Sequence, residues 1–199
     1  MDNDEAGEEE DFRMGVQLNT QENATLSLLL SREAIAARVE DLAIQISRDY
    51  AGKDLLLVGV LKGAFVFLAD LMRALEIPVQ VDFVRLASYG TGATSAGQVR
   101  VILDLAASIA GRHVLIVEDI LDSGLTLGFL LERLRARQPA SLKLCVLLNK
   151  RIRRVYEITP DYTGFDVPDG FVVGYGIDYA ERYRHLPAIY VLSFPTSDA

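Results

Sequence analysis

The chain has 199 residues, half of them hydrophobic, and a net charge of −8. This length and apolar content suffice for one domain with a sheet-and-helix core. Residues 1–22 hold eight acidic residues and one base, Arg13, and therefore account for −7 of the net charge. The rest of the chain is close to neutral and lacks the basic composition of a nucleic-acid binder, so no nucleic-acid partner is expected.

The N-terminal segment differs in composition from the rest of the chain. We expect residues 1–25 to form a disordered acidic tail and residues 26–199 to form the domain. The segment lacks the apolar core of a secretory signal, and no apolar run approaches the ~20 residues that cross a bilayer. The single cysteine, Cys145, lies in an apolar run and is expected to be buried. These observations favour a cytoplasmic protein without membrane contact.

Strands and helices are predicted to alternate along the chain. The patterns predict helices over 31–51, 64–75 and 126–137, and strands over 54–60, 79–86, 99–103, 114–117, 142–148 and 188–193. This alternation favours an α/β fold with a central, mainly parallel sheet flanked by helices. Residues 149–187 break the rhythm with turns and a short aromatic strand over 171–175. We expect them to form most of a small subdomain over the edge of the sheet.

The most informative stretch follows the strand expected over 114–117. Glu118 and Asp119 come where that strand is expected to end, and a tight polar turn over 122–124 precedes the next helix. In an open α/β sheet, ligands bind at the carboxyl ends of strands, and free N–H groups at a helix start favour phosphate. Adjacent carboxylates repel each other, so the pair is useful if it binds a diol or lies near a metal. For the pair alone, a solvated strand end is the simpler alternative.

The whole run over 114–127 resembles the phosphoribosyl-pyrophosphate (PRPP) loop of the type I phosphoribosyltransferases. The resemblance implies that Glu118 and Asp119 hold the ribose hydroxyls. It implies a cradle for the 5′-phosphate made of Asp122, Ser123, Gly124, Leu125 and Thr126. Asp122 would also be catalytic, either acting on the purine N7 proton or steadying the ribosyl cation.

Lys62 and Gly63 form a second loop, after the strand expected over 54–60. A lysine beside bare backbone N–H groups suits an anion, although a lysine at a strand end often has no such role. By resemblance, this is the pyrophosphate loop. In purine-specific members of the family it often carries a non-proline cis peptide, which in this chain would join Leu61 to Lys62.

Residues 88–98 form a third loop, which is polar and rich in glycine. A mobile hairpin tip is the simpler interpretation. Its start, Ser88-Tyr89-Gly90, resembles the catalytic loop of hypoxanthine-type phosphoribosyltransferases. The resemblance implies a lid that excludes water from a reactive cation.

Lys150 and the run over 171–184 resemble the purine-binding hood of the hypoxanthine-guanine phosphoribosyltransferases. The resemblance implies that Phe171 stacks on the purine, although core packing is the commoner role of a strand phenylalanine. Lys150 would donate to the 6-oxo group, and Val172 with Asp178 would contact the far edge of the base. Arg184 would reach pyrophosphate.

The sequence departs from the usual family pattern in two places. Residue 151 is arginine where the family usually has proline after the lysine. Ala106 and Ala107 lie in a stretch that is usually more acidic. The first departure concerns the backbone geometry at Lys150 rather than the catalytic groups.

The resemblance spans residues 26–194 and is nearest to the bacterial hypoxanthine phosphoribosyltransferases. It implies transfer of 5-phosphoribosyl from PRPP to hypoxanthine or guanine, which gives IMP or GMP and pyrophosphate. Mg²⁺ would be the cofactor, near Glu118, Asp119 and Asp178, and the family forms homodimers and homotetramers. A PRPP-responsive RNA-binding regulator on the same fold is the alternative. A phosphate-binding NTPase is disfavoured because no G-x-x-x-x-G-K-[ST] run exists.

Removing residues 1–22 should leave kcat and the melting temperature nearly unchanged. The segment is acidic, poor in apolar residues, and ends before the first helix pattern. Steady-state kinetics and thermal unfolding of the full and shortened chains check this. A large fall in melting temperature would show that the tail docks on the domain.

Overall fold

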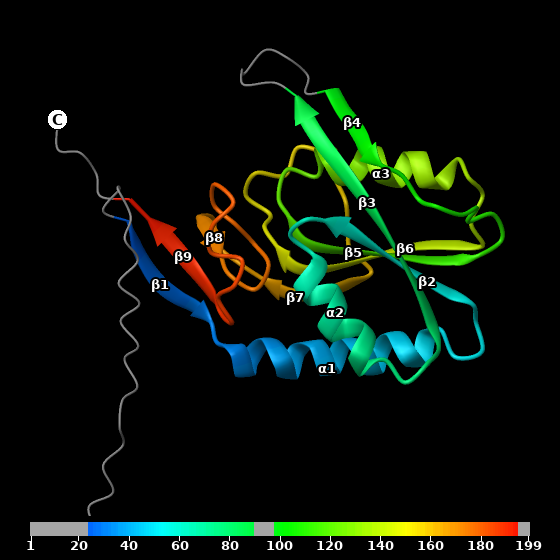
Figure 1. Cartoon of the computed structure of the whole chain (residues 1–199), viewed down its shortest axis with the longest axis horizontal. Coiled ribbons are helices and arrows are strands. Elements are labelled where there is room, and N and C mark those ends of the chain that lie inside the picture. The colour runs from blue at the N-terminus through cyan, green and yellow to red at the C-terminus, as the bar shows by residue number, and fades with distance from the viewer. Residues whose placement is uncertain (1–23, 90–97, 195–199) are drawn as a thin grey trace, which may run out of the picture.

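The structure is a computed structural model that describes residues 24–89 and 98–194. It contains two sheets (Figure 1), one of six strands in the order β4-β3-β2-β5-β6-β7 and one of three in the order β1-β9-β8. The strands are β1 Thr25–Leu30, β2 Leu55–Leu61, β3 Val79–Tyr89, β4 Gln98–Leu103, β5 His113–Leu121, β6 Ser141–Asn149, β7 Tyr162–Asp166, β8 Phe171–Val173 and β9 Ile189–Ser193. The helices are α1 Arg32–Asp49, α2 Phe65–Ala74 and α3 Leu125–Arg135.

The larger sheet is parallel except for β4, which runs antiparallel to β3. Successive residues of a strand face opposite sides, and both sides of the central strands are buried. Leu55 and Leu57 of β2 pack in the core with α1 and α2, whereas Leu56 and Val58 pack in a second core with α3. The predicted mainly parallel α/β sheet flanked by helices is therefore confirmed.

The smaller sheet lies at one end of the molecule and combines distant parts of the chain (Figure 1). Its outer strand, β1, pairs with β9 from Thr25 opposite Ser193. The sequence pattern missed β1 and assigned Thr25 to the tail, because the strand depends on pairing with the other end of the chain. Residues 1–23 of the predicted tail lie outside the described residues.

Three other expectations about strands were wrong in extent. β5 does not end at Val117 but continues through the acidic pair to Leu121, because β6 pairs with it as far as Asn149. β7, which lies in the region expected to form the hood and was not predicted as a strand, joins the larger sheet by pairing with β6 from Tyr162 opposite Cys145. Ser88 and Tyr89 were expected in a loop but lie in β3, paired with β4. Gly90, the third predicted lid residue, lies outside the described residues.

Predictions that depend on a few neighbouring residues were more reliable than the predicted extents of the strands. The hydroxyl of Ser31, the predicted cap of α1, accepts a hydrogen bond from the Ala34 N–H at 3.2 Å. Cys145 is fully buried and free, as expected, and its apolar surroundings raise the pKa of its thiol. Of the helices that the structure describes, none has the length and apolar content to cross a membrane.

Candidate active site

A cavity of about 290 Å³ lies where β2 and β5 end and α3 begins. β2 and β5 are parallel neighbours, so their carboxyl ends meet at one edge of the sheet. The polar residues that line the cavity are Glu118, Asp122, Ser123, Gly124 and Thr126, all predicted site residues. The structure therefore brings together the acidic strand end and the loop that the sequence associated with phosphate.

The two acidic side chains have different surroundings. Glu118 lines the cavity, whereas Asp119 reaches the loop after β2. A Cβ atom at Gly63 would lie 1.7 Å from Asp119 Oδ2, so any larger residue at position 63 would displace the Asp119 carboxylate. The close approach of these residues fixes the acidic pair against the Lys62–Gly63 loop.

Burial and mutual repulsion make this pair expensive to ionise. Burial, followed by the charge of Asp119, raises the pKa of Glu118 well above its ordinary value. Burial also raises the pKa of Asp119, although a hydrogen bond from Glu118 and one from the Ile120 N–H at 3.0 Å offset part of that rise. The pair is thus electrostatically unfavourable without a ligand, which is typical of a functional site.

Glu118→Gln should stabilise the ligand-free protein at neutral pH. A carboxyl whose pKa is raised by folding keeps its proton in the native state while the unfolded chain loses it, so stability falls as pH rises above the ordinary value. Removing that cost should add roughly 0.5–2 kcal/mol, or about 1–8 °C in melting temperature. Thermal unfolding at several pH values measures this. The gain should vanish below about pH 4, where both states are protonated; a gain independent of pH would contradict the explanation.

The backbone of Asp122 is fixed by a hydrogen bond, whereas one oxygen of its carboxylate has no partner among the described residues. The Asp122 carbonyl accepts a hydrogen bond from Arg154 Nε at 2.8 Å. Within the described residues, its Oδ1 atom is buried without a hydrogen-bond partner. A buried carboxylate oxygen without a donor is costly, and at a cavity wall it marks a position for a ligand donor.

The start of α3 supplies the second half of the cavity wall. Gly124 precedes the helix with φ +81°, a left-handed conformation that favours glycine. The first turn of α3 carries N–H groups without helical acceptors, and these suit an anionic oxygen. Leu125, which was predicted in the cradle, begins the helix with its side chain exposed.

The loop after β2 faces a charged part of the hood. The predicted cis peptide between Leu61 and Lys62 is present. Lys62 Nζ lies 2.8 Å from Glu181 Oε2, and Arg184 Nη2 lies 2.6 Å from Asp178 Oδ1. Glu181 lies within the hood run over 171–184, but the sequence predicts no role for it because its partner Lys62 is remote along the chain.

The hood loop packs directly on the Lys62–Gly63 loop. A Cβ at Gly176, where φ is +97°, would lie 2.4 Å from the Gly63 carbonyl oxygen. Arg184 Nη1 donates to the Gly176 carbonyl at 2.8 Å. Among the described residues, Arg184 Nε is buried without an acceptor, so this guanidinium retains a donor for a ligand.

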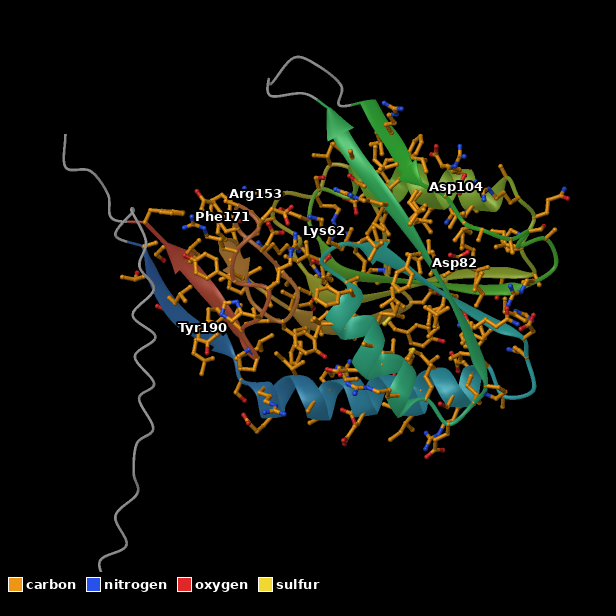
Figure 2. All side chains as sticks on the ribbon, in the orientation of Figure 1. Lys62, Asp82, Asp104, Arg153, Phe171 and Tyr190 are labelled. Carbon is orange, nitrogen blue, oxygen red and sulfur yellow. The ribbon has the colours of Figure 1, made fainter. Side chains whose placement is uncertain are left out.

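Lys150 and Phe171, the two side chains predicted to bind the purine, differ in their exposure to solvent. Lys150 is buried at the end of β6, its Nζ donates to the Gly170 carbonyl, and burial lowers its pKa. Phe171, labelled with Lys62 in Figure 2, is 55% exposed and meets Tyr179 edge-on at 6.2 Å. An exposed ring can stack on a planar ligand. Val172 is buried behind it.

The unusual residue Arg151 does not displace Lys150. Its Nη2 forms an exposed ion pair with Asp166 Oδ2 at 3.1 Å. The Lys150 N–H donates to the Leu121 carbonyl at 2.9 Å, which ties the lysine to the end of β5. The backbone geometry that this departure put in question is therefore anchored on β5.

The three predicted metal ligands do not form a cluster. Within the described ranges, no three histidine, cysteine or acidic residues gather closely enough to hold a metal ion. Asp178 is instead engaged by Arg184, while Glu118 and Asp119 remain as a pair. Mg²⁺ is commonly bound through one or two carboxylates plus substrate phosphates and water. The acidic pair fits a magnesium ion that a phosphorylated substrate brings with it.

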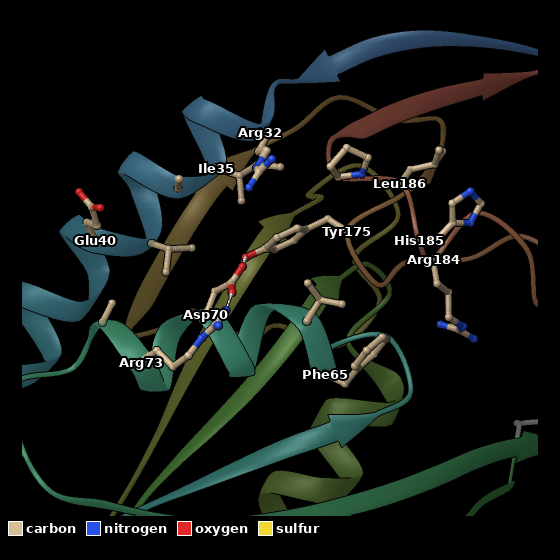
Figure 3. Close-up of a pocket in the computed structure, with 15 residues that line it drawn as sticks. Arg32, Ile35, Glu40, Phe65, Asp70, Arg73, Tyr175, Arg184, His185 and Leu186 are labelled. Atoms are coloured by element: carbon tan, nitrogen blue, oxygen red, sulfur yellow. Dashed lines mark hydrogen bonds and ion pairs between the residues drawn. The ribbon is translucent and has the colours of Figure 1, made fainter. Parts of the chain in front are cut away.

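A larger cavity, of about 780 Å³, lies between α1, α2 and the hood (Figure 3). In it, the Tyr175 hydroxyl donates to Asp70 Oδ2 at 2.6 Å. Burial and this carboxylate raise the pKa of Tyr175, so the hydroxyl stays protonated. Neither Glu118 nor Asp122 lines this cavity, and it has no phosphate-type loop. We therefore assign the site to the smaller cavity.

An acidic pair, a polar turn with Gly124 at a helix start and a lysine loop share one edge of a parallel sheet. This arrangement is typical of α/β proteins that bind phosphate-bearing ligands at the carboxyl ends of their strands. The family model of the phosphoribosyl transferase domain matches residues 26–180, and the chain belongs to that family.

Individual relatives agree with this assignment. The chain is 47% identical to the hypoxanthine-guanine phosphoribosyltransferase of Bacillus subtilis over 165 residues, which cover 83% of this chain and 92% of the relative. It is also 47% identical to the hypoxanthine phosphoribosyltransferase of Escherichia coli over 167 residues, 83% of this chain and 94% of that one. The crystal structure of a hypoxanthine-guanine phosphoribosyltransferase from Bacillus anthracis superposes with a TM-score of 0.80 at 43% identity, covering 86% and 100% of the two chains.

Proposed function

We propose that this protein transfers the 5-phosphoribosyl group of PRPP to a 6-oxopurine, hypoxanthine or guanine, in purine salvage. The products are IMP or GMP and pyrophosphate. The observation that carries the proposal is the common edge at which β2, β5 and β6 end. Lys62 and Lys150 follow β2 and β6, and the segment over 118–126 spans the end of β5. Relatives of nearly the same length bear the names of these enzymes.

The donor half of the reaction belongs to the cavity at β5 and α3. Glu118 and Asp119 accept hydrogen bonds from the ribose hydroxyls, and the turn over 122–126 receives the 5′-phosphate at the start of α3. Lys62 and Arg184 hold pyrophosphate, which requires them to leave Glu181 and Asp178. When bound, Mg²⁺ neutralises the developing charge on pyrophosphate.

The acceptor half belongs to the hood. Phe171 stacks on the purine with its exposed face, and Lys150 exchanges its bond to the Gly170 carbonyl for one to the 6-oxo oxygen. Val172 and Asp178 contact the far edge of the base. Asp122 takes the N7 proton or steadies the oxocarbenium-like ribosyl group, using the oxygen that has no partner in the described structure. Ser88, Tyr89 and Gly90 belong to the lid.

Pyrophosphate release should depend on PRPP, a 6-oxopurine and Mg²⁺ together. A coupled assay with hypoxanthine, guanine and adenine in turn measures this, and titration with EDTA tests the metal. Turnover should be lost when EDTA exceeds Mg²⁺ and should return when Mg²⁺ is restored. Full turnover in excess EDTA would refute the role of the metal, and no turnover with either 6-oxopurine would refute the function.

Assembly and location complete the proposal. We expect two or four copies to associate in the cytoplasm, and light scattering of the purified protein tests the assembly. A related structure, from Trypanosoma cruzi, concerns the oligomeric state of that hypoxanthine phosphoribosyl transferase. Because the relatives are named as transferases, no observation favours the RNA-binding alternative.

A further inference from the structure

The guanidinium of Arg154 occupies the point where β5 and β6 separate. The last pair of the two strands is Leu121 opposite Asn149; beyond it, one strand enters the phosphate turn and the other reaches Lys150. Backbone carbonyls lose their ladder partners where strands diverge and need other donors when buried. The donors at this point come from one side chain.

Arg154 donates to both diverging strands at once. Its hydrogen bonds are Nε to Asp122 O at 2.8 Å, Nη1 to Ile158 O at 2.7 Å, and Nη2 to Leu121 O at 3.3 Å, Asn149 Oδ1 at 2.7 Å and Lys150 O at 2.7 Å. All five acceptors are uncharged. A planar guanidinium with donors on three nitrogens can bridge such a set, whereas a lysine ammonium cannot match its geometry.

The residues that follow Arg154 hold the same turn from the other side. The N–H groups of Val155 and Tyr156 both donate to the Ser123 carbonyl, at 2.9 and 3.0 Å. A Cβ at Gly124 would lie 2.4 Å from the Tyr156 carbonyl oxygen and 3.3 Å from Arg154 Cδ. The segment over 154–156 therefore packs directly against the phosphate turn.

We propose that Arg154 is a positioning residue that fixes Asp122 relative to Lys150. This inference rests on the proposed function, in which Asp122 acts at N7 of the purine and Lys150 binds its 6-oxo group. The two groups belong to different strands, and Arg154 bonds to the backbone carbonyl of each. Arg154 itself contacts neither substrate.

The expected signature is a loss of kcat without a matching loss of substrate binding. PRPP binds mainly at the phosphate turn and the acidic pair, so it should still bind if the turn shifts slightly relative to Lys150. The reaction step requires Asp122 and Lys150 to contact the purine at the same time, and a displacement of about 1 Å between them can lower the rate ~10²-fold. A purely structural role predicts something else, namely that kcat falls only in proportion to the protein still able to bind.

The Arg154→Lys substitution tests the positioning role. It keeps the positive charge and the aliphatic part of the side chain but removes the planar guanidinium with its several donors. We would measure kcat, both KM values and, by calorimetry with PRPP and Mg²⁺, the binding stoichiometry. The proposal predicts one site per chain and a kcat lower by about 10²-fold, with smaller changes in KM. The matched control is Arg153→Met, since Arg153 is exposed and its guanidinium bonds to Asp169; its kcat should stay within about 3-fold of the native value.

Two results would overturn the proposal: a kcat within about 3-fold of native at full stoichiometry, or a kcat that falls only as stoichiometry falls. Hydrogen exchange tests the positioning role of Arg154 independently of the proposed function, because it requires no turnover. Three amides should exchange faster in the ligand-free Arg154→Lys protein than in the native protein: that of Lys150, which bonds to Leu121 at the end of β5, and those of Val155 and Tyr156, which bond to Ser123 in the turn. If the native protein has no turnover, the proposed function fails, and unchanged exchange at these amides would still refute the positioning role.

Discussion

Asp122→Asn should lower kcat by ~10²–10⁴-fold while the protein stays folded. The carboxylate has a buried oxygen without a partner in the described residues, so it does not hold the fold together through that atom. Its backbone carbonyl, which does bond to Arg154, is unchanged by the substitution. Asparagine fills the same space but cannot take a proton from purine N7 or offer a charge to the ribosyl cation.

Steady-state kinetics and thermal unfolding together check this effect. A matched control is Asp54→Asn, because Asp54 is an exposed carboxylate just before β2, at the opposite edge of the sheet, paired with Arg112. It should leave kcat unchanged and lower the melting temperature only slightly. An unchanged kcat in the folded Asp122→Asn protein would place the acid–base or electrostatic role on another residue.

Lys150→Ala should reduce kcat/KM for hypoxanthine roughly ten- to a hundredfold and leave the KM for PRPP nearly unchanged. Lys150 is 6% exposed and only donates hydrogen bonds. A 6-oxo group accepts such a bond, whereas a 6-amino group would leave the buried ammonium facing another donor. A charge-assisted hydrogen bond contributes about 1.5–3 kcal/mol, which corresponds to this range of discrimination.

The measurement is kcat/KM for hypoxanthine, guanine and adenine in the native and Lys150→Ala proteins. Lys143→Ala provides the control, because Lys143 lies earlier in β6 and pairs with Asp49 away from the cavity. It should not alter the preference for 6-oxopurines. A native protein that uses adenine as well as hypoxanthine would show that the base assignment is wrong, and only the phosphoribosyl half of the account would survive.

The sequence predicted the architecture because its signals are local. Apolar runs marked β2, β5 and β6, and the alternation with helices implied parallel pairing, which the structure confirms. β1 and β7 were missed because neither run has a periodicity of its own that distinguishes a strand from a loop. β1 forms through pairing with β9, and β7 through pairing with β6.

The site shows the same division between local and distant signals. The acidic pair and the turn at 122–124 were found as one contiguous motif, and in the structure Glu118 and the turn line one cavity while Asp119 contacts the Lys62–Gly63 loop. Arg154 was not found, because within its basic surroundings it resembles a solvated surface residue. Its role depends on carbonyls of two strands that meet only in the fold. Likewise, the sequence did not indicate a role for Glu181, because its contact is with Lys62, a residue far away in the chain.

Product analysis of the native protein tests the central claim most directly. Incubation with PRPP, Mg²⁺ and hypoxanthine, followed by chromatography, should yield IMP and pyrophosphate in equal amounts, and guanine should yield GMP in the same way. The Asp122→Asn protein should form IMP at a rate lower by ~10²–10⁴-fold under the same conditions. Absence of any nucleotide from either base, with a folded protein that binds PRPP, would contradict the account.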